Sequence, residues 1–134
     1  MPVDYRDAAQ RHYEDAGYLL AGARLANADH LFGLSAECAL KAVMLLLDIK
    51  LKPKDVPYEH IDTLWEEFRT FANKNNGARY ASMLDTSNLF ATWKVNQRYD
   101  HRNDITKVRV EVHQQAAKKV KQILNTAILN GGVI

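Results

Sequence analysis

The chain has 134 residues, of which 47% are hydrophobic and 25% are charged, and it contains only 6 Gly and 3 Pro. This length fits one domain spanning residues 1–134, and the composition excludes a disordered or low-complexity chain. The single Cys38 excludes an intrachain disulfide and a cysteine-rich zinc site. No uninterrupted apolar stretch approaches the ~20 residues of a membrane span, and the N-terminus lacks a signal pattern, so we expect a cytoplasmic protein.

The net charge of +2 is unevenly distributed along the chain. Residues 98–121 hold seven Lys or Arg against three Asp or Glu, which gives this segment a charge of +4 and leaves −2 for the rest. Such a basic C-terminal element would meet a phosphate or an acidic partner, or it would be an ordinary solvated helix face rich in Lys. Both interpretations stay open.

Two helices with a short connection are predicted in the first third of the chain. Residues 4–25 place apolar side chains three or four apart, with Asp4 as the N-cap. Residues 29–49 are apolar almost all round, which is typical of a helix in the middle of a bundle. Because the connection is short, with Asn27 or Asp29 capping the second helix, we expect an antiparallel hairpin.

The remaining elements also indicate helices. Residues 60–74 show a 3.6-residue apolar period, 78–92 predict a shorter and less regular helix, and 104–130 predict a long final helix. Residues 50–59 indicate a loop and 93–103 a polar linker. The fold class is therefore all-α, an up-and-down bundle of four main helices plus a short helix. The predicted core stripe of the last helix consists of Ile105, Val108, Val112, Ala116, Val120, Ile123 and Ala127.

Four polar side chains form one line on the otherwise apolar helix at 29–49. His30, Glu37, Lys41 and Asp48 lie within about 40° of one another at 100° per residue. Glu37 and Lys41 have the i,i+4 spacing of a helical ion pair. Either this line faces water as a weak surface pair, or it lines a groove that meets a ligand or a dimer mate, with Gly33 permitting close approach.

Residues 93–104 (WKVNQRYDHRND) are the chemically densest part of the chain and precede the predicted last helix. Free N–H groups at a helix N-terminus attract anions, and Arg98 and Arg102 would add forked donors for phosphate. Tyr99 would stack on a base or donate its hydroxyl to a phosphate. His101 would act as a general acid or base. This segment is therefore a candidate site for a nucleotide or RNA.

The same segment also has a purely structural interpretation. Asp100 and Asp104 would pair with the arginines, Asn103 or Asp104 would only cap the helix, and Tyr99 would fill the core.

Arg109 and His113 lie one turn apart on the last helix. Such a pair would cleave RNA if the His moved the 2′-hydroxyl proton and the Arg stabilised the charged phosphorane, although this spacing is common on helices by chance. The chain has no HExxH motif, no ExxH motif and no Cys/His cluster, so no metal is expected. It has no Gly-rich phosphate loop and no GxSxG motif, and we expect no cofactor. Cys38 lies among aliphatic residues and is predicted to be an inert core thiol.

Four sequence elements together resemble the HEPN (higher eukaryotes and prokaryotes nucleotide-binding) domain family. They are HYEDA at 12–16, AECALKA at 36–42, HIDTLW at 60–65 and the RY pair at 98–99 before a long last helix. The resemblance covers roughly residues 5–125. It implies a small helical bundle whose two long helices pack antiparallel, and often a homodimer. Many relatives resemble toxin or defence ribonucleases that are partnered with minimal nucleotidyltransferases.

The family's cleavage motif is an Arg, four to six residues and then a His at the entrance of the last helix. Arg102 and Asn103 resemble its start, but residues 107–109 are Lys, Val and Arg, so no His follows at the required distance. Two residues separate Arg98 from His101, and three separate Arg109 from His113. Other branches of the family lack the motif and bind nucleotides or partners instead, and this chain resembles them more closely.

Three functions are therefore weighed. The first is a non-catalytic module that binds a nucleotide or RNA phosphate at the N-terminus of the last helix, with the Glu37–Lys41 line beside this site. Its binding residues would be Arg98, Tyr99, Arg102 and Asn103. The second is a metal-independent toxin or defence ribonuclease of the HEPN type, and the third is a structural bundle that dimerises or docks a partner. In the ribonuclease, Arg102 or Arg109 would stabilise the phosphate and His101 or His113 would carry the proton.

Overall fold

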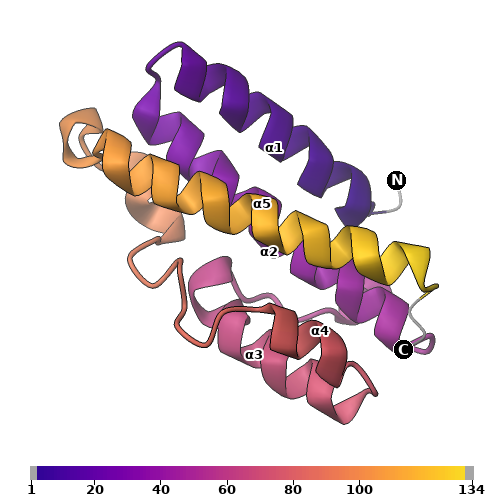
Figure 1. The fold of residues 1–134 in the computed structure, drawn as a ribbon. Helices are drawn as coiled ribbons and strands as arrows, with labels where there is room; N and C mark the ends of the chain where they lie inside the picture. Colours follow the sequence, from indigo (N-terminus) through magenta and orange to yellow (C-terminus); the bar gives the residue numbers. More distant parts are fainter. Residues whose placement is uncertain (1–2, 132–134) are drawn as a thin grey trace.

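The computed structural model describes residues 3–131, and these residues form helices and turns without a β-strand (Figure 1). The five α-helices are α1 (Tyr5–Ala21), α2 (Leu25–Leu47), α3 (Ile61–Lys74), α4 (Ala78–Met83) and α5 (Lys107–Leu129). Three short 3-10 helices connect them, namely η1 (Pro53–Asp55), η2 (Val95–Tyr99) and η3 (Arg102–Asp104). The predicted all-α bundle of four main helices plus a short one is confirmed.

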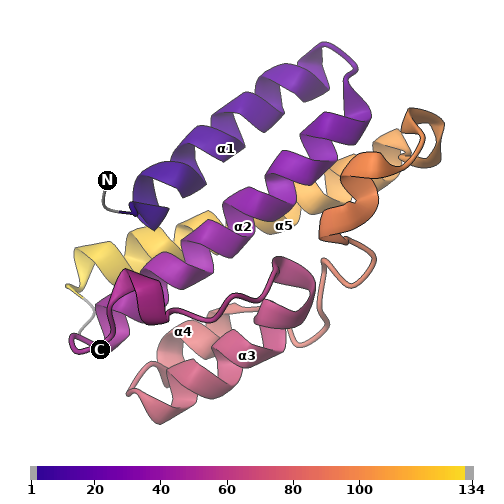
Figure 2. The ribbon, with the colours of Figure 1, turned by 180° about the vertical axis from the view of Figure 1, so that it is seen from behind.

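Helix α2 is the centre of the bundle. It packs against α1 and α5 along most of its length and against α3 on its remaining side. Figures 1 and 2 show α1 on one side of α2 and the α3–α4 pair on the other, with α5 crossing the bundle. The segment that contains η2 and η3 covers the end of the bundle where the α1–α2 turn lies (Figure 2). This placement determines which polar side chains meet.

The apolar character of α2 comes from its buried position. Phe32, Ala36, Leu40 and Val43 have no solvent exposure. By length and composition α2 would also cross a membrane, but 67% of its most apolar window is buried inside the bundle, and core helices of soluble proteins meet the same criterion. Burial raises the pKa of the Cys38 thiol to about 12, so this thiol is protonated at neutral pH, which agrees with its predicted inertness.

Small residues bring α1 and α2 close together. Ala9 and Ala16 are fully buried on α1, and the Ser35 hydroxyl on α2 donates a hydrogen bond of 2.7 Å to the Ala9 carbonyl. The expected antiparallel hairpin of α1 and α2 therefore forms. The predicted N-cap of α1 is also confirmed, because the Asp4 carboxylate accepts a hydrogen bond from the Asp7 N–H at 2.9 Å.

The turn between α1 and α2 lies earlier than the sequence predicts. It spans residues 22–24, with Ala23 at a φ of 59°, and Arg24 takes the N-cap position without a side-chain cap. The prediction that Asn27 or Asp29 caps α2 is wrong. Asp29 is fully buried inside the helix, where side chains from distant segments bind its carboxylate, so the helix extends through it.

The second half of the chain also departs from prediction at its boundaries. The predicted helix at 78–92 ends at Met83, and the last helix begins at Lys107 rather than 104, with the Thr106 hydroxyl accepting a hydrogen bond from Arg109 N–H at 3.2 Å. Two residues of the predicted core stripe are also wrong, because Val108 is 74% exposed and Val112 is 48% exposed. The buried face of the first turns of α5 consists of Val110 and His113, since α5 is oriented by polar contacts to Asp29 as well as by its apolar residues.

Gly33 has the close approach that the sequence indicates, but the neighbour belongs to the same chain. A Cβ at Gly33 would lie 2.1 Å from Cε2 of Trp93. Trp93 is fully buried, and its indole N–H donates to the Asp29 carbonyl at 3.0 Å. The bare backbone of α2 therefore forms the seat for this side chain and fixes the segment before η2.

Candidate functional site

Three arginines line one pocket at the N-terminal end of α2. The pocket has a volume of about 660 Å³ and lies between the α1–α2 turn and the segment from η2 to Ile105. Arg24 comes from the turn, and Arg98 and Arg102 come from the segment before α5. We call it the arginine pocket; it is lined by Ala23, Arg24, Leu25, Ala26, Asn27, Arg98, Asp100, Arg102, Asn103 and Ile105.

The three guanidinium groups in the arginine pocket are without carboxylate partners. Among residues 3–131, no Asp or Glu oxygen lies within 4.0 Å of Arg24, Arg98 or Arg102, although Asp100 lines the same pocket. The structural interpretation in which Asp100 and Asp104 neutralise these arginines is therefore wrong. An uncompensated cluster of forked cations is suited to an anion with several acceptor oxygens.

The helix N-terminus at this pocket is that of α2, not that of α5. The first N–H groups of α2 have no partner within the helix, and Arg24 provides no side-chain cap for them. Asn103 does not cap α5, because it belongs to η3, three residues before the Thr106 cap. Arg98, Arg102 and Asn103, which the sequence predicts as phosphate-binding candidates, therefore line one pocket, but the helix end beside them is that of α2.

Tyr99 and His101 lie at the surface beside these residues. Tyr99 is 77% exposed, which rules out a core role, and the Arg98 guanidinium lies 4.9 Å from the centre of its ring. His101 is exposed, and its Nδ1 accepts a hydrogen bond of 3.1 Å from the Asn103 N–H. Burial, followed by the positive charge of Arg98, lowers the pKa of His30 on α2.

A buried polar network holds the segment before α5 against α2. The Asp29 carboxylate contacts His113 Nδ1 at 2.6 Å and accepts a hydrogen bond from Gln97 Nε2 at 2.7 Å. Arg109 Nε lies 3.5 Å from the same carboxylate, and its Nη2 donates to Gln97 Oε1 at 2.8 Å. We call Asp29, Gln97, Arg109 and His113 the Asp29 network. Gln97 precedes Arg98 directly, so this network positions one wall of the arginine pocket.

Arg109 and His113 also border a second pocket, of about 440 Å³, on the other side of the network. Its remaining walls come from the segment 88–92 and Val112. The His113 side chain is only 2% exposed, and its ring stacks on Phe90 with centroids 4.9 Å apart. The structure therefore brings the predicted pair Arg109 and His113 together at one pocket. His101 and Arg102 lie elsewhere, on the exposed segment before α5.

Glu37 and Lys41 are buried and lie far from the arginine pocket. Glu37 Oε2 accepts from Lys41 Nζ at 3.3 Å, while Oε1 accepts from Ile61 N–H at 3.1 Å and contacts His60 Nδ1 at 3.0 Å. The interpretation as a water-facing surface pair is therefore wrong. Lys41 lies 17 residues beyond Arg24, about 25 Å along the helix axis, so the Glu37–Lys41 line does not join the arginines in one pocket.

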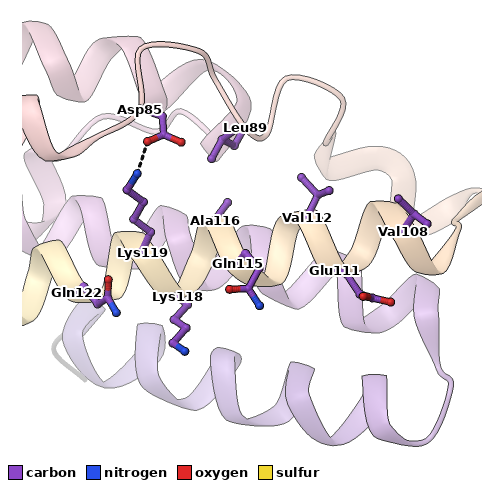
Figure 3. Close-up of a pocket in the computed structure, with 10 residues that line it drawn as sticks. All are labelled: Asp85, Leu89, Val108, Glu111, Val112, Gln115, Ala116, Lys118, Lys119 and Gln122. Carbon is purple, nitrogen blue, oxygen red and sulfur yellow. Dashed lines mark hydrogen bonds and ion pairs between the residues drawn. The ribbon is translucent and has the colours of Figure 1, made fainter.

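Another groove runs along the outer face of α5 (Figure 3). Its volume is about 740 Å³, and the exposed Val108 and Val112 lie in it together with Leu89 from the preceding loop. Lys119 forms an ion pair with Asp85 across it. The two valines are the ones that the sequence pattern placed in the core.

Sequence reasoning missed Arg24, Asp29, Gln97 and His60 as members of these clusters. Asp29 carried a signal, because a carboxylate within a nearly all-apolar helix must be paired if it is buried. The other three have no local signal, since the residues that they meet lie tens of positions away in the chain. Among residues 3–131, no group of three or more His, Cys, Asp or Glu side chains is arranged to hold a metal ion.

No family model matches this sequence, and the comparisons with curated proteins and with solved structures found no match.

Proposed function

We propose that this protein binds a nucleotide or an RNA phosphate in the arginine pocket. The observation that carries the proposal is that Arg24, Arg98 and Arg102 line one pocket and have no carboxylate partner within 4.0 Å among residues 3–131. Guanidinium groups donate two parallel hydrogen bonds to phosphate oxygens, and unpaired cations gathered in one pocket raise the local concentration of anions.

The surroundings of the arginines favour a nucleotide over a simple inorganic anion. A volume of about 660 Å³ lies within the usual range of small-molecule sites. The exposed ring of Tyr99, held next to Arg98, offers a stacking surface for a base. Asn27 and Asn103 supply amide groups for polar atoms of a sugar or base. The HEPN resemblance supports the same class of ligand.

The double variant Arg98→Ala/Arg102→Ala is expected to bind ADP at least tenfold more weakly than the wild-type chain, because two of the three phosphate donors are lost. Isothermal titration calorimetry at low salt measures this effect, and added NaCl should weaken wild-type binding. Arg79→Ala is the matched control, since Arg79 is an exposed arginine on α4 that does not line the pocket.

Two results would contradict the proposal. One is the absence of saturable binding of both ADP and a short single-stranded RNA to the folded wild-type protein. The other is equal binding by the wild type and the double variant. A negative result with both ligands, together with a stable dimer in light scattering, would favour the third function, a bundle that docks a partner.

The ribonuclease remains a second candidate because of one specific contact. Asp29 holds His113 Nδ1 at 2.6 Å, which leaves Nε2 as the nitrogen that exchanges protons, and Arg109 borders the same pocket. In this reaction His113 would accept the 2′-hydroxyl proton while the 2′-oxygen attacks phosphorus and the 5′-oxygen leaves. Arg109 would stabilise the charge on the phosphorane.

If this candidate is correct, the wild-type chain cleaves a single-stranded RNA in the presence of EDTA, and His113→Ala lowers the rate by about 10²–10⁴-fold. His101→Ala is the matched control, because His101 is exposed and lies outside this pocket. Circular dichroism must show that both variants are folded. The absence of cleavage by the wild-type chain would exclude the candidate.

A further inference from the structure

A separate small pocket opens at the other half of α2. It has a volume of about 310 Å³ and lies between the start of α1, the middle of α2 and the loop that contains η1. Most of its wall is apolar or aromatic, and two lysines supply its charge. Its lining includes Tyr5, Lys41, Lys54, Val56, Pro57 and Tyr58.

Lys41 is a buried cation whose donors are incompletely used. Its side chain is only 7% exposed, and within the described part of the chain its single hydrogen bond is the 3.3 Å contact to Glu37. Its other contact is with the face of the Tyr5 ring, whose centre lies 5.7 Å from Nζ. An ammonium group has three N–H donors, and buried donors without acceptors are costly. Lys41 lines the pocket, so an acceptor placed there would satisfy the remaining donors.

The Glu37 carboxylate fixes both the position and the charge balance of this site. Its two oxygens are engaged by Lys41, by the Ile61 N–H and by His60, so it has little capacity for a ligand. Its negative charge lies directly behind Lys41 and opposes a polyanion. One additional negative charge, shared between Lys41 and Lys54, would be accommodated without an excess of either sign.

We propose that this pocket binds a small organic monoanion, a carboxylic acid with an aromatic or compact apolar body. The carboxylate would accept hydrogen bonds from Lys41, and the body would pack against Tyr5, Val56 and Pro57. This site goes beyond the proposed function and is independent of it, because Lys41 is about 20 Å or more along α2 from the residues of the arginine pocket. A volume of about 310 Å³ suits a molecule much smaller than a nucleotide.

Phenylacetate is the probe, and phenylacetamide is its neutral isostere. Ligand titrations followed by ¹H–¹⁵N NMR spectroscopy should give saturable shifts for phenylacetate in the backbone amides of Lys54, Val56 and Tyr58. The dissociation constant should be on the order of 0.1–1 mM for a ligand of this size. Phenylacetamide and the variant Lys41→Met should each show at least tenfold weaker binding. The Arg98→Ala/Arg102→Ala variant should bind phenylacetate normally, so this test is separate from that of the arginine pocket.

Lys41→Met leaves Glu37 without its cation, and this could prevent the variant from folding. A second variant keeps the proposal testable in that case. Glu37→Gln/Lys41→Met removes both charges and keeps an acceptor for the Ile61 N–H, so it should fold and fail to bind phenylacetate. The proposal is overturned if the wild type shows no saturable shifts with phenylacetate up to about 10 mM, which is roughly ten times the largest dissociation constant expected. It is also overturned if the wild type binds phenylacetamide as tightly as phenylacetate. The same holds if the folded Glu37→Gln/Lys41→Met variant binds phenylacetate as tightly as the wild type does.

Discussion

Replacing Asp29 with Ala should lower the free energy of unfolding by about 3–5 kcal/mol, because it removes the only carboxylate of a buried network. His113 and Gln97 would each lose a short hydrogen bond, of 2.6 Å and 2.7 Å, and Arg109 would lose its nearby counter-charge. Buried polar groups that lose their partners bear the full cost of desolvation. Urea denaturation at pH 7 measures the loss.

Asp7→Ala is the matched control, since it deletes a carboxylate that lies at the surface 3.7 Å from Arg11. Exposed pairs of this kind contribute little, so a change below about 1 kcal/mol is expected. Asp29→Asn should fall between the two, because it keeps the size of the side chain but not its charge. An Asp29→Ala variant as stable as Asp7→Ala would show that the network does not stabilise the fold.

Gly33→Ala should destabilise the protein by about 1–3 kcal/mol, although alanine favours helices over glycine by about 1 kcal/mol. The new Cβ would lie 2.1 Å from Trp93 Cε2 and 2.2 Å from Nε1, so the indole would have to move. That movement would also weaken the hydrogen bond from the indole N–H to the Asp29 carbonyl. The position of an alanine Cβ is fixed by the backbone, so the side chain at position 33 cannot turn away from the indole.

Gly17→Ala tests the opposite case on α1. A Cβ at Gly17 meets no atom within 4 Å, so this substitution should stabilise the protein by roughly 0.5–1 kcal/mol through helix propensity alone. Thermal denaturation of the two variants should therefore give melting temperatures that move in opposite directions. A rise for both would mean that Trp93 is not seated on α2 at Gly33.

The two substitutions also connect stability with the arginine pocket. Asp29 holds Gln97, and Gly33 seats Trp93, so both act on the segment that carries Arg98 and Arg102. Loosening this segment would increase the entropy that ADP binding must remove. A folded Asp29→Asn variant is thus expected to bind ADP more weakly than the wild type, without any change in the residues that line the pocket.

The local features that were predicted correctly depend on neighbours in the chain. The 3.6-residue apolar period identified the helices, and Asp4 was recognised as a cap because its acceptor role involves a residue three positions away. The apolar character of α2 indicated its central position. Gly33 indicated a close approach, although nothing in the sequence named Trp93 as the neighbour, 60 residues further on.

The sequence by itself determined an all-helical bundle with a central apolar helix and a cluster of cationic residues before the last helix. These follow from periodicity and composition, which are properties of short segments. Only the tertiary structure decided that the cluster meets the start of α2 and Arg24, and that Lys41, paired with Glu37, borders another pocket. The rotation of α5, which exposes Val108 and buries His113, follows from its pairing with Asp29. Such contacts join residues about 70–85 positions apart, and their energies depend on burial that no single segment determines.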